Sequence, residues 1–145
     1  MTDIASKRPI PIPDDASRPF FEGARRHELM LQRCNTCGAF MWPVKDRCDV
    51  CWSGDVRWVK ASGKGTLYSF VLMHQLYHPG FADEIPYNVS IVDLAEGVRM
   101  TTNVVGLPNA ELRVGMPLEV TFDDINEEIT LPKFGPAQSA PCQNC

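Results

Sequence analysis

The sequence lacks the features of a membrane or secreted protein. No stretch of its 145 residues approaches the roughly 20 consecutive apolar residues that span a bilayer. The first thirty residues hold no apolar run of signal-peptide length. We therefore expect a cytoplasmic protein with no membrane partner. At 44% hydrophobic and 22% charged residues, the composition is that of an ordinary globular protein with one domain or two small ones.

Basic residues are also scarce. Lys and Arg number 14 against 18 Asp and Glu, which gives a formal net charge of −4. Because affinity for nucleic acid comes largely from contacts of Lys and Arg with phosphates, this balance argues against nucleic acid as the main partner. Taken alone, each small basic cluster is typical of a solvated face, but together they could hold one small anion. These clusters are Arg25 with Arg26, Lys45 with Arg47, and Lys60 with Lys64.

The local sequence offers no convincing catalytic group. The three histidines, His27, His74 and His78, have no Ser, Cys or acidic partner at the short spacing of a nucleophile and its base. Pairs that are distant in the sequence remain open. A free-standing enzyme is therefore the least favoured function.

Cysteine, by contrast, is abundant and regularly spaced. Cys34, Cys37, Cys48 and Cys51 form two Cys-x-x-Cys pairs that are ten residues apart, a pattern typical of a tetrahedral zinc site. Four thiolates fill the coordination shell and leave no position for water or substrate, so the site should be structural. Iron in a rubredoxin-like site is the main alternative, because it uses the same ligands. A redox dithiol and a pair of disulfides are less favoured.

A third Cys-x-x-Cys motif, Cys142 and Cys145, ends the sequence. Four cysteines already satisfy a zinc ion, so a loose tail with free thiols is the simpler interpretation. The alternative is a redox pair or half of an intermolecular metal site.

The residues before the cysteines predict an arm and a helix. Pro9, Pro11 and Pro13 cannot belong to a helix and predict an extended arm over residues 1–16. Ser17-Arg18-Pro19 is typical of a helix start, with Ser17 or Asp15 as the cap. On the helix that follows, one face should carry Phe20, Ala24 and His27.

Two strands should flank the metal site. Alternation from Glu28 predicts a strand that leads into Cys34, and residues 56–60 predict the returning strand. Between the cysteine pairs lies the apolar run 39–44, which we expect to cover the thiolates with Phe40 and Trp42. Either ring could instead face a partner or an acyl chain.

The second half of the chain is rich in β-branched and aromatic residues and predicts a small antiparallel barrel. The turn at residues 62–65 separates it from the metal region, and the irregular but hydrophobic loop 76–86 is a candidate functional loop. Strands are predicted at residues 66–73, 87–94, 98–105 and 118–122, with a short piece at 129–132.

These patterns divide the chain into four parts and predict a mainly β fold. The parts are the extended arm (residues 1–16), the helix and zinc ribbon (17–62), the barrel (63–134) and a flexible tail (135–145).

From about Arg18 to Leu131, the sequence resembles the DUF35 family. The resemblance is carried by Pro-Phe-Phe-Glu-Gly in the helix, Leu-Met-Leu-Gln-Arg-Cys before Cys-x-x-Cys-Gly, the second Cys-x-x-Cys, and Ser-Gly-Lys-Gly-Thr-Leu-Tyr-Ser-Phe. Pro86–Val89 and Val114–Val120 complete it. The resemblance implies an N-terminal helix and rubredoxin-like zinc ribbon followed by a small OB-fold-like β-barrel, which agrees with the strands predicted above.

The resemblance also implies a role in acyl-CoA metabolism. Proteins similar to this one accompany thiolase-type enzymes, or hydratases and aldolases that act on CoA thioesters, as small accessory subunits whose partner supplies the catalytic residues. We expect a thiolase-type (β-oxoacyl-CoA acyltransferase) partner first and a hydratase or retro-aldolase second, with the chain closing over the partner's CoA-thioester site.

Two departures from the family pattern affect the expected contacts. The usual Pro-Pro-Arg-like run between the cysteine pairs is here Trp42-Pro43-Val44-Lys45. An anion contact there would pass to Lys45 or Arg47, so Lys45, Arg47 and Lys64 are the expected contacts for the phosphates of CoA. The cysteine tail also lies outside the pattern.

A different class of function remains open for a barrel of this kind. OB-folds often bind single-stranded nucleic acid by stacking bases on aromatic rings in a basic groove. Trp58, Tyr68 and Phe70 are the candidate rings. The acidic balance of the chain argues against this alternative.

Overall fold

The computed structural model describes residues 10–76 and 79–137. His78, most of the predicted arm, and both Cys142 and Cys145 lie outside these residues. The described part contains one α-helix, eight strands and two short 3-10 helices. In chain order these are α1 (Arg18–Arg25), β1 (Met30–Cys34), β2 (Phe40–Met41), β3 (Val56–Lys60), β4 (Lys64–Met73), η2 (Pro79–Phe81), β5 (Tyr87–Leu94), β6 (Arg99–Thr102), η3 (Asn109–Glu111), β7 (Pro117–Asp124) and β8 (Thr130–Pro136).

Helix α1 begins where the sequence predicts, but its cap differs. The carboxylate of Asp14 accepts hydrogen bonds from the backbone N–H and the hydroxyl of Ser17, both at 2.8 Å, and the Asp14 N–H donates to Ser17 Oγ. The Ser17 hydroxyl is thereby occupied outside the helix, and Asp15 instead pairs with Arg18 at 2.5 Å. The predicted side-chain cap by Ser17 or Asp15 was therefore wrong.

No helix in the described residues is long and apolar enough to span a membrane.

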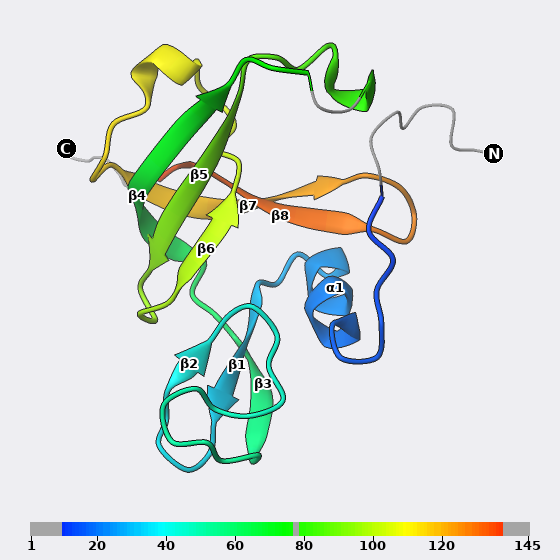
Figure 1. Ribbon diagram of the computed structural model, residues 1–145, viewed down its shortest axis with the longest axis vertical. Helices are drawn as coiled ribbons and strands as arrows, with labels where there is room; N and C mark the ends of the chain where they lie inside the picture. The colour runs from blue at the N-terminus through cyan, green and yellow to red at the C-terminus, as the bar shows by residue number, and fades with distance from the viewer. Residues whose placement is uncertain (1–9, 77–78, 138–145) are drawn as a thin grey trace.

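The first sheet is the ribbon and has the strand order β2-β1-β3, all antiparallel. β1 lies in the centre and places Leu31 and Cys34 inside. The strands predicted before Cys34 and over residues 56–60 are confirmed as β1 and β3. In Figure 1 this sheet forms the lower lobe of the molecule, below the second sheet.

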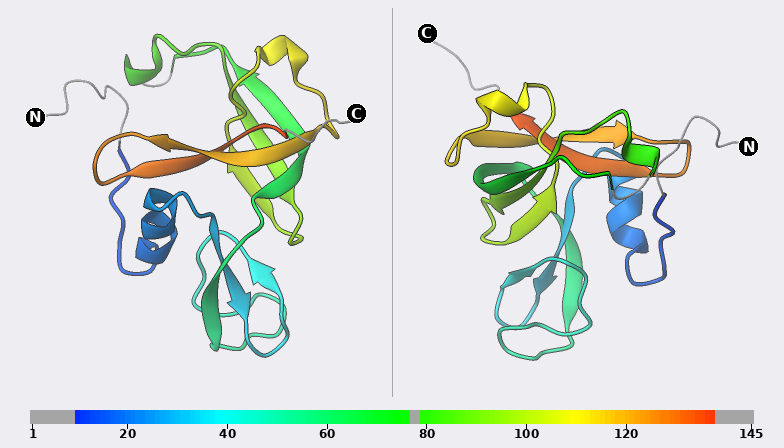
Figure 2. Two further views of the ribbon diagram at one scale, coloured as in Figure 1. Left: turned by 180° about the vertical axis from the view of Figure 1, so that it is seen from behind. Right: turned by 45° about the horizontal axis from the view of Figure 1, so that its top comes forward.

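The second sheet has the order β6-β5-β4-β7-β8 and curls into an OB-like half-barrel. A parallel bridge between Val104 and Phe134 joins its two ends, with the N–H of Val105 donating to the Phe134 carbonyl at 2.8 Å. In Figure 1, β7 and β8 cross behind β4, β5 and β6, and in the left view of Figure 2, seen from the opposite side, they lie in front. The predicted mainly β fold with an OB-fold-like barrel is confirmed.

Strand β8 is longer than the short piece predicted at residues 129–132. It pairs with β7 along its whole length, from Thr130 opposite Asp124 to Pro136 opposite Leu118. The two prolines and the glycine in Leu131–Pro136 hide the strand in the sequence. Prolines are tolerated here because β8 is an edge strand of the ladder.

One hydrophobic core joins the two sheets. Leu29, Leu31 and Ala61 from the ribbon side are buried in the same cluster as Leu67 and Phe134 of the barrel. Phe20 of α1 packs against this cluster, so the helix lies in the angle between the lobes (Figure 1). The ribbon and the barrel are therefore packed as one unit.

His27 has a partner that is distant in the sequence. It adopts φ 61°, which ends α1, and its ring stacks on Phe122 with centroids 5.0 Å apart. His27 Nε2 lies 3.1 Å from Asp124 Oδ1, and Thr130 Oγ1 donates to the same carboxylate at 2.6 Å. His27 therefore lies beyond the end of the helix. The prediction that it shares a helical face with Phe20 was wrong.

Substitution of Asp124 is expected to change the acid sensitivity of the protein. The hydrogen bond from Thr130, followed by that from His27, lowers the pKa of Asp124 below its ordinary 3.8. A folded-state pKa below the unfolded one stabilises the protein above that unfolded value, and the stabilisation is lost as the pH falls through the folded pKa. Melting curves between about pH 5 and about pH 3 should therefore fall less steeply for Asp124→Asn than for the wild type.

Glu127→Gln, in the exposed turn between β7 and β8, is the control for that experiment. It should follow the wild-type curve. Identical acid sensitivity of Asp124→Asn and the wild type would mean that these hydrogen bonds do not stabilise the fold.

Candidate functional site

The four predicted cysteines lie together at the tip of the ribbon. Their sulfur atoms are all within 4.8 Å of one another. Cys34 Sγ is 3.6 Å from Cys51 Sγ, and Cys37 Sγ is 3.5 Å from Cys48 Sγ, so each short distance joins the two halves of the site. A tetrahedral ion with metal–sulfur bonds of about 2.3 Å holds its ligands about 3.8 Å apart, whereas a disulfide would need about 2.05 Å. The cluster fits a four-thiolate metal ion and contains no disulfide.

Backbone N–H groups point at two of the sulfurs. The N–H groups of Thr36 and Cys37 lie 3.3 and 3.4 Å from Cys34 Sγ, and those of Val50 and Cys51 lie 3.3 and 3.5 Å from Cys48 Sγ. The Cys37 N–H, with that of Thr36 adding to it against the effect of burial, lowers the pKa of Cys34 from 9.0 to about 6. Such donors favour the thiolate, which is the form that binds metal.

The two Cys-x-x-Cys turns share one backbone conformation, but the residue with a positive φ is a glycine in the first turn and a tryptophan in the second. In the first, the N–H of Gly38 donates to the Cys34 carbonyl at 2.9 Å; in the second, the N–H of Trp52 donates to the Cys48 carbonyl at 2.9 Å. Gly38 has φ 81° and Trp52 has φ 65°. The left-handed conformation of the second turn therefore falls on a tryptophan that is 74% exposed, and not on Gly54, which the sequence shows three residues after Cys51.

Trp52→Gly is expected to stabilise the isolated protein by about 1 kcal/mol, since a non-glycine residue in the left-handed region costs about 1–3 kcal/mol and glycine removes most of it. Little packing is lost, because the side chain is exposed. The measurement is the urea midpoint, with the metal content held equal. Gly38→Ala is the matched control and should lose stability, since it forces a side chain into the same conformation; a loss for both variants would contradict the strain argument.

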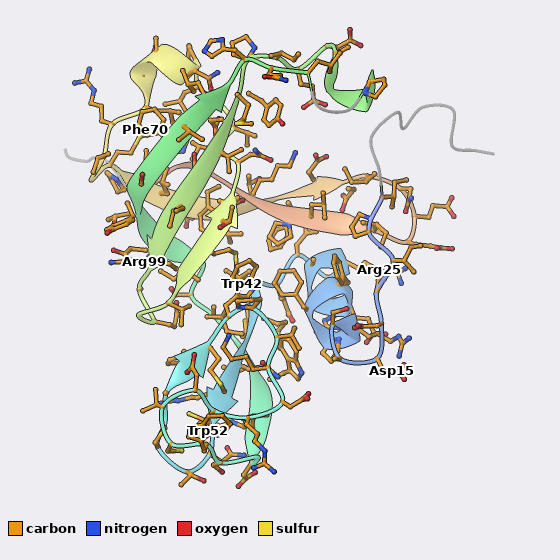
Figure 3. All side chains as sticks on the ribbon, viewed as in Figure 1. Asp15, Arg25, Trp42, Trp52, Phe70 and Arg99 are labelled. Carbon is orange, nitrogen blue, oxygen red and sulfur yellow. The ribbon has the colours of Figure 1, made fainter. Side chains whose placement is uncertain are left out.

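The thiolates are covered by different residues than the sequence suggested. Met41, buried at 2% exposure, packs with Cys34 and Cys48, and Ala39 and Val56 lie against them. Phe40 and Trp42 pack on the core shared with the barrel instead. In Figure 3, Trp42 lies between the lobes and Trp52 at the far tip of the ribbon. The prediction that Phe40 and Trp42 cover the thiolates was wrong, because an apolar run does not reveal which of two cores it joins.

A buried amide fixes the loop between the two cysteine pairs. Gln32, at 5% exposure, donates to the Lys45 carbonyl at 3.0 Å and accepts from the Lys45 N–H at 2.8 Å. The alternation from Glu28 puts Gln32 on the opposite side of the strand from Leu31 and does not indicate that this side is buried as well. Its position two residues before Cys34 gives no sign of this clamp.

The predicted anion contacts lie in two different parts of the structure. Lys45 and Arg47 belong to the loop between the cysteine pairs, where Arg47 donates to the Trp52 carbonyl at 3.1 Å. Lys64 begins β4 and lines a shallow hollow together with Asp93 and Ala95. An anion bound by all three would have to reach from the ribbon to the barrel, so their role stays a prediction.

The three aromatic rings considered for base stacking do not share a face. Trp58 belongs to β3 of the ribbon, Phe70 packs against the core, and Tyr68 lies outside beneath Arg99. A stacking platform of these rings is therefore not present.

Comparison with known proteins places the chain in a family. Residues 21–57 match the rubredoxin-like zinc ribbon domain of ChsH2, and residues 58–123 match the C-terminal OB-fold domain of ChsH2. Together the two matches cover the metal site and most of the barrel.

Three relatives extend this result. A probable enoyl-CoA hydratase alpha subunit of Thermomonospora curvata is 38% identical over 90% of this chain, which spans 40% of that subunit's length. The benzoylsuccinyl-CoA thiolase subunit BbsA of Thauera aromatica is 26% identical over 79% of this chain and 72% of its own length. A chain in the solved structure of the Ltp2-ChsH2(DUF35) aldolase is 36% identical, with a TM-score of 0.79 over 88% of this chain and 98% of that one. This chain therefore belongs to the DUF35 family, as a ChsH2-like protein that joins a rubredoxin-like zinc ribbon to an OB-fold.

Proposed function

We propose that the chain is an accessory subunit of an enzyme complex that acts on CoA thioesters. The observation that carries this proposal is the match to a chain of the Ltp2-ChsH2(DUF35) aldolase, which this chain covers over 98% of its length at 36% identity. The hydratase alpha subunit and the thiolase subunit BbsA support the same general role.

The metal site supports a structural task for this subunit. Its four thiolates fill a tetrahedral shell, and a shell of this kind has no open position for a substrate. Zinc is the proposed metal, because the matching domain is a zinc ribbon and four cysteines in a tetrahedral arrangement are a common structural zinc site. In this proposal the catalytic residues belong to the partner, and the protein is cytoplasmic.

The class of the partner is the finer part of the proposal. A thiolase-type partner was the first expectation from the sequence, and the 26% identity with BbsA supports it. The relatives of higher identity are a hydratase alpha subunit at 38% and an aldolase component at 36%. We therefore place the hydratase or aldolase partner first and the thiolase partner second.

Direct contact with CoA is proposed for the basic side chains of the ribbon and of β4. Arg47 is exposed beside the metal site and Lys64 is exposed at the start of the barrel, while Lys45 is half-buried. In this proposal they meet phosphates of a thioester held mainly by the partner.

Native affinity purification of the tagged chain tests the proposal. It should recover a hydratase, aldolase or thiolase subunit in a fixed ratio. The isolated complex should turn over a CoA thioester of the class on which the recovered enzyme acts. Metal analysis of the same sample should give one zinc per chain. Recovery of the chain alone, or of nucleic acid in its place, would contradict the accessory role.

A further inference from the structure

The first half of β5 has its polar and apolar sides inverted. Asn88 and Ser90 point inward and are buried at 6% and 0% exposure, while Tyr87, Val89 and Ile91 alternate with them on the outside. A strand of an antiparallel sheet that has one solvent-exposed face normally carries apolar residues inside and polar residues outside. The inversion therefore needs a reason on each side of the sheet.

The inward polar residues have their reason within the chain. Asn88 donates to the Val104 carbonyl at 2.8 Å and to Asn109 Oδ1 at 3.2 Å, and its Oδ1 accepts from the Ser90 hydroxyl and the Val104 N–H, both at 2.8 Å. These bonds hold the segment after β6 across the end of the barrel. Val89 and Ile91, on the other side of the strand, are not partners in these hydrogen bonds.

The outward apolar residues continue onto the neighbouring strand. Register sets Val71 opposite Val89 and Met73 opposite Tyr87. Val71 is 54% exposed and Tyr68 is 46% exposed. No described element lies in front of this side of the sheet in Figure 1. We call this surface the outer face, and it consists of Tyr68, Val71, Met73, Tyr87, Val89 and Ile91.

A fixed arginine marks one end of the outer face. The guanidinium of Arg99 lies 3.7 Å from the centre of the Tyr68 ring, and its Nε donates to Asp93 at 2.9 Å. The Arg99 side chain remains 55% exposed, and Figure 3 places it beside the lower ends of the strands. Tyrosine and arginine are both enriched at protein interfaces and among the residues that contribute most to binding.

The size of the outer face bears on whether it binds a second copy of this chain or a different protein. At about 3.3 Å per residue and about 4.8 Å between strands, the eight residues of β5 with its two neighbours make a face of roughly 26 by 14 Å. Its area, about 360 Å², is less than half of the roughly 800 Å² per partner that a stable interface buries. Two copies packed through the outer face alone would bury less than a stable interface needs, so the outer face fits a larger contact with another protein.

The neighbouring surface allows such an extension. β7 pairs with β4 only at Lys64–Thr66, so beyond Leu67 the far edge of β4 has no strand partner in the described residues. Leu72 and Leu76 are exposed along and beyond this edge, at 36% and 46%. A partner that rounds the edge of β4 would bury them together with the outer face.

We propose that the outer face and the adjoining edge of β4 form the docking surface for the CoA-thioester enzyme subunit. This inference rests on the proposed function. The matching surface of the enzyme is apolar at its centre and carries a carboxylate opposite Arg99.

Two variants with the same change in charge test the docking surface. Val71→Glu places a carboxylate on the exposed centre of the outer face, and Thr121→Glu places one on the exposed outward side of β7. An uncompensated charge in an apolar contact should lower the amount of enzyme subunit recovered with tagged Val71→Glu by about tenfold or more. Thr121→Glu should recover as much enzyme as the wild type.

A photo-crosslinking residue in place of Val71, in the otherwise native chain, provides a second measurement that does not depend on the stability of Val71→Glu. It should attach the enzyme subunit. Undiminished recovery with Val71→Glu would overturn the docking surface while leaving the accessory role intact, and a crosslink between two copies of this chain would assign the outer face to a homodimer. Failure of the wild type to recover any enzyme would overturn the accessory role itself.

Discussion

Chelation of the metal is expected to unfold the tip of the ribbon and to leave the barrel folded. The hydrophobic cluster at the metal site has three buried residues, Cys34, Met41 and Cys48, and two of these are metal ligands. So small a core cannot hold the loops from Cys34 to Asp55 without a metal. Structural zinc sites in small peptides supply about 10–16 kcal/mol of apparent binding free energy, and that binding free energy is folding free energy.

Hydrogen exchange after treatment with a chelator measures this effect by segment. Residues 34–55 should lose protection, while β5 and β7 should keep most of theirs, because their hydrogen bonds are made within the barrel. Cys48→Ser should reproduce the result without a chelator. The matched control is the double variant Cys142→Ser with Cys145→Ser, which should retain the metal. Continued protection of the ribbon without metal would show that the cysteine cluster does not stabilise it.

Phe134→Ala is expected to cost about 3–5 kcal/mol, the usual effect of truncating a fully buried phenylalanine. Phe134 has 0% exposure and is the largest of the fully buried side chains. Its backbone also closes the barrel, since its N–H donates to the Asn103 carbonyl at 3.1 Å and its carbonyl accepts from Val105. The cavity would therefore open where the two ends of the sheet meet.

Urea unfolding measures that loss, with Leu131→Ala as the control. Leu131 lies on the same strand but is only half-buried, so its truncation should cost clearly less. A loss below about 1 kcal/mol for Phe134→Ala would show that the barrel closes by other contacts.

The metal site could be predicted because its signal is local. The ligands come in two pairs of Cys-x-x-Cys, and each pair forms one turn whose geometry is set by a few adjacent residues. The strands beside it, β1 and β3, were predicted for the same reason, since alternation over five residues is enough to define a strand.

The missed features depend on contacts between distant residues. His27 and Asp124 are 97 positions apart, and Asn88 holds a segment that begins at Val104. The local sequence around each gives no indication of its partner. Strand β8 was underestimated because its prolines are permitted only by its place at the edge of the ladder, which a single segment does not reveal.

The most direct test of the accessory role is a titration of this chain into the purified enzyme subunit recovered with it, with turnover of the CoA thioester as the readout. We expect no turnover from the chain alone, and a turnover or thermal stability of the enzyme that rises and saturates at a fixed ratio. Turnover by the chain alone, or an enzyme unaffected by its addition, would contradict the accessory role.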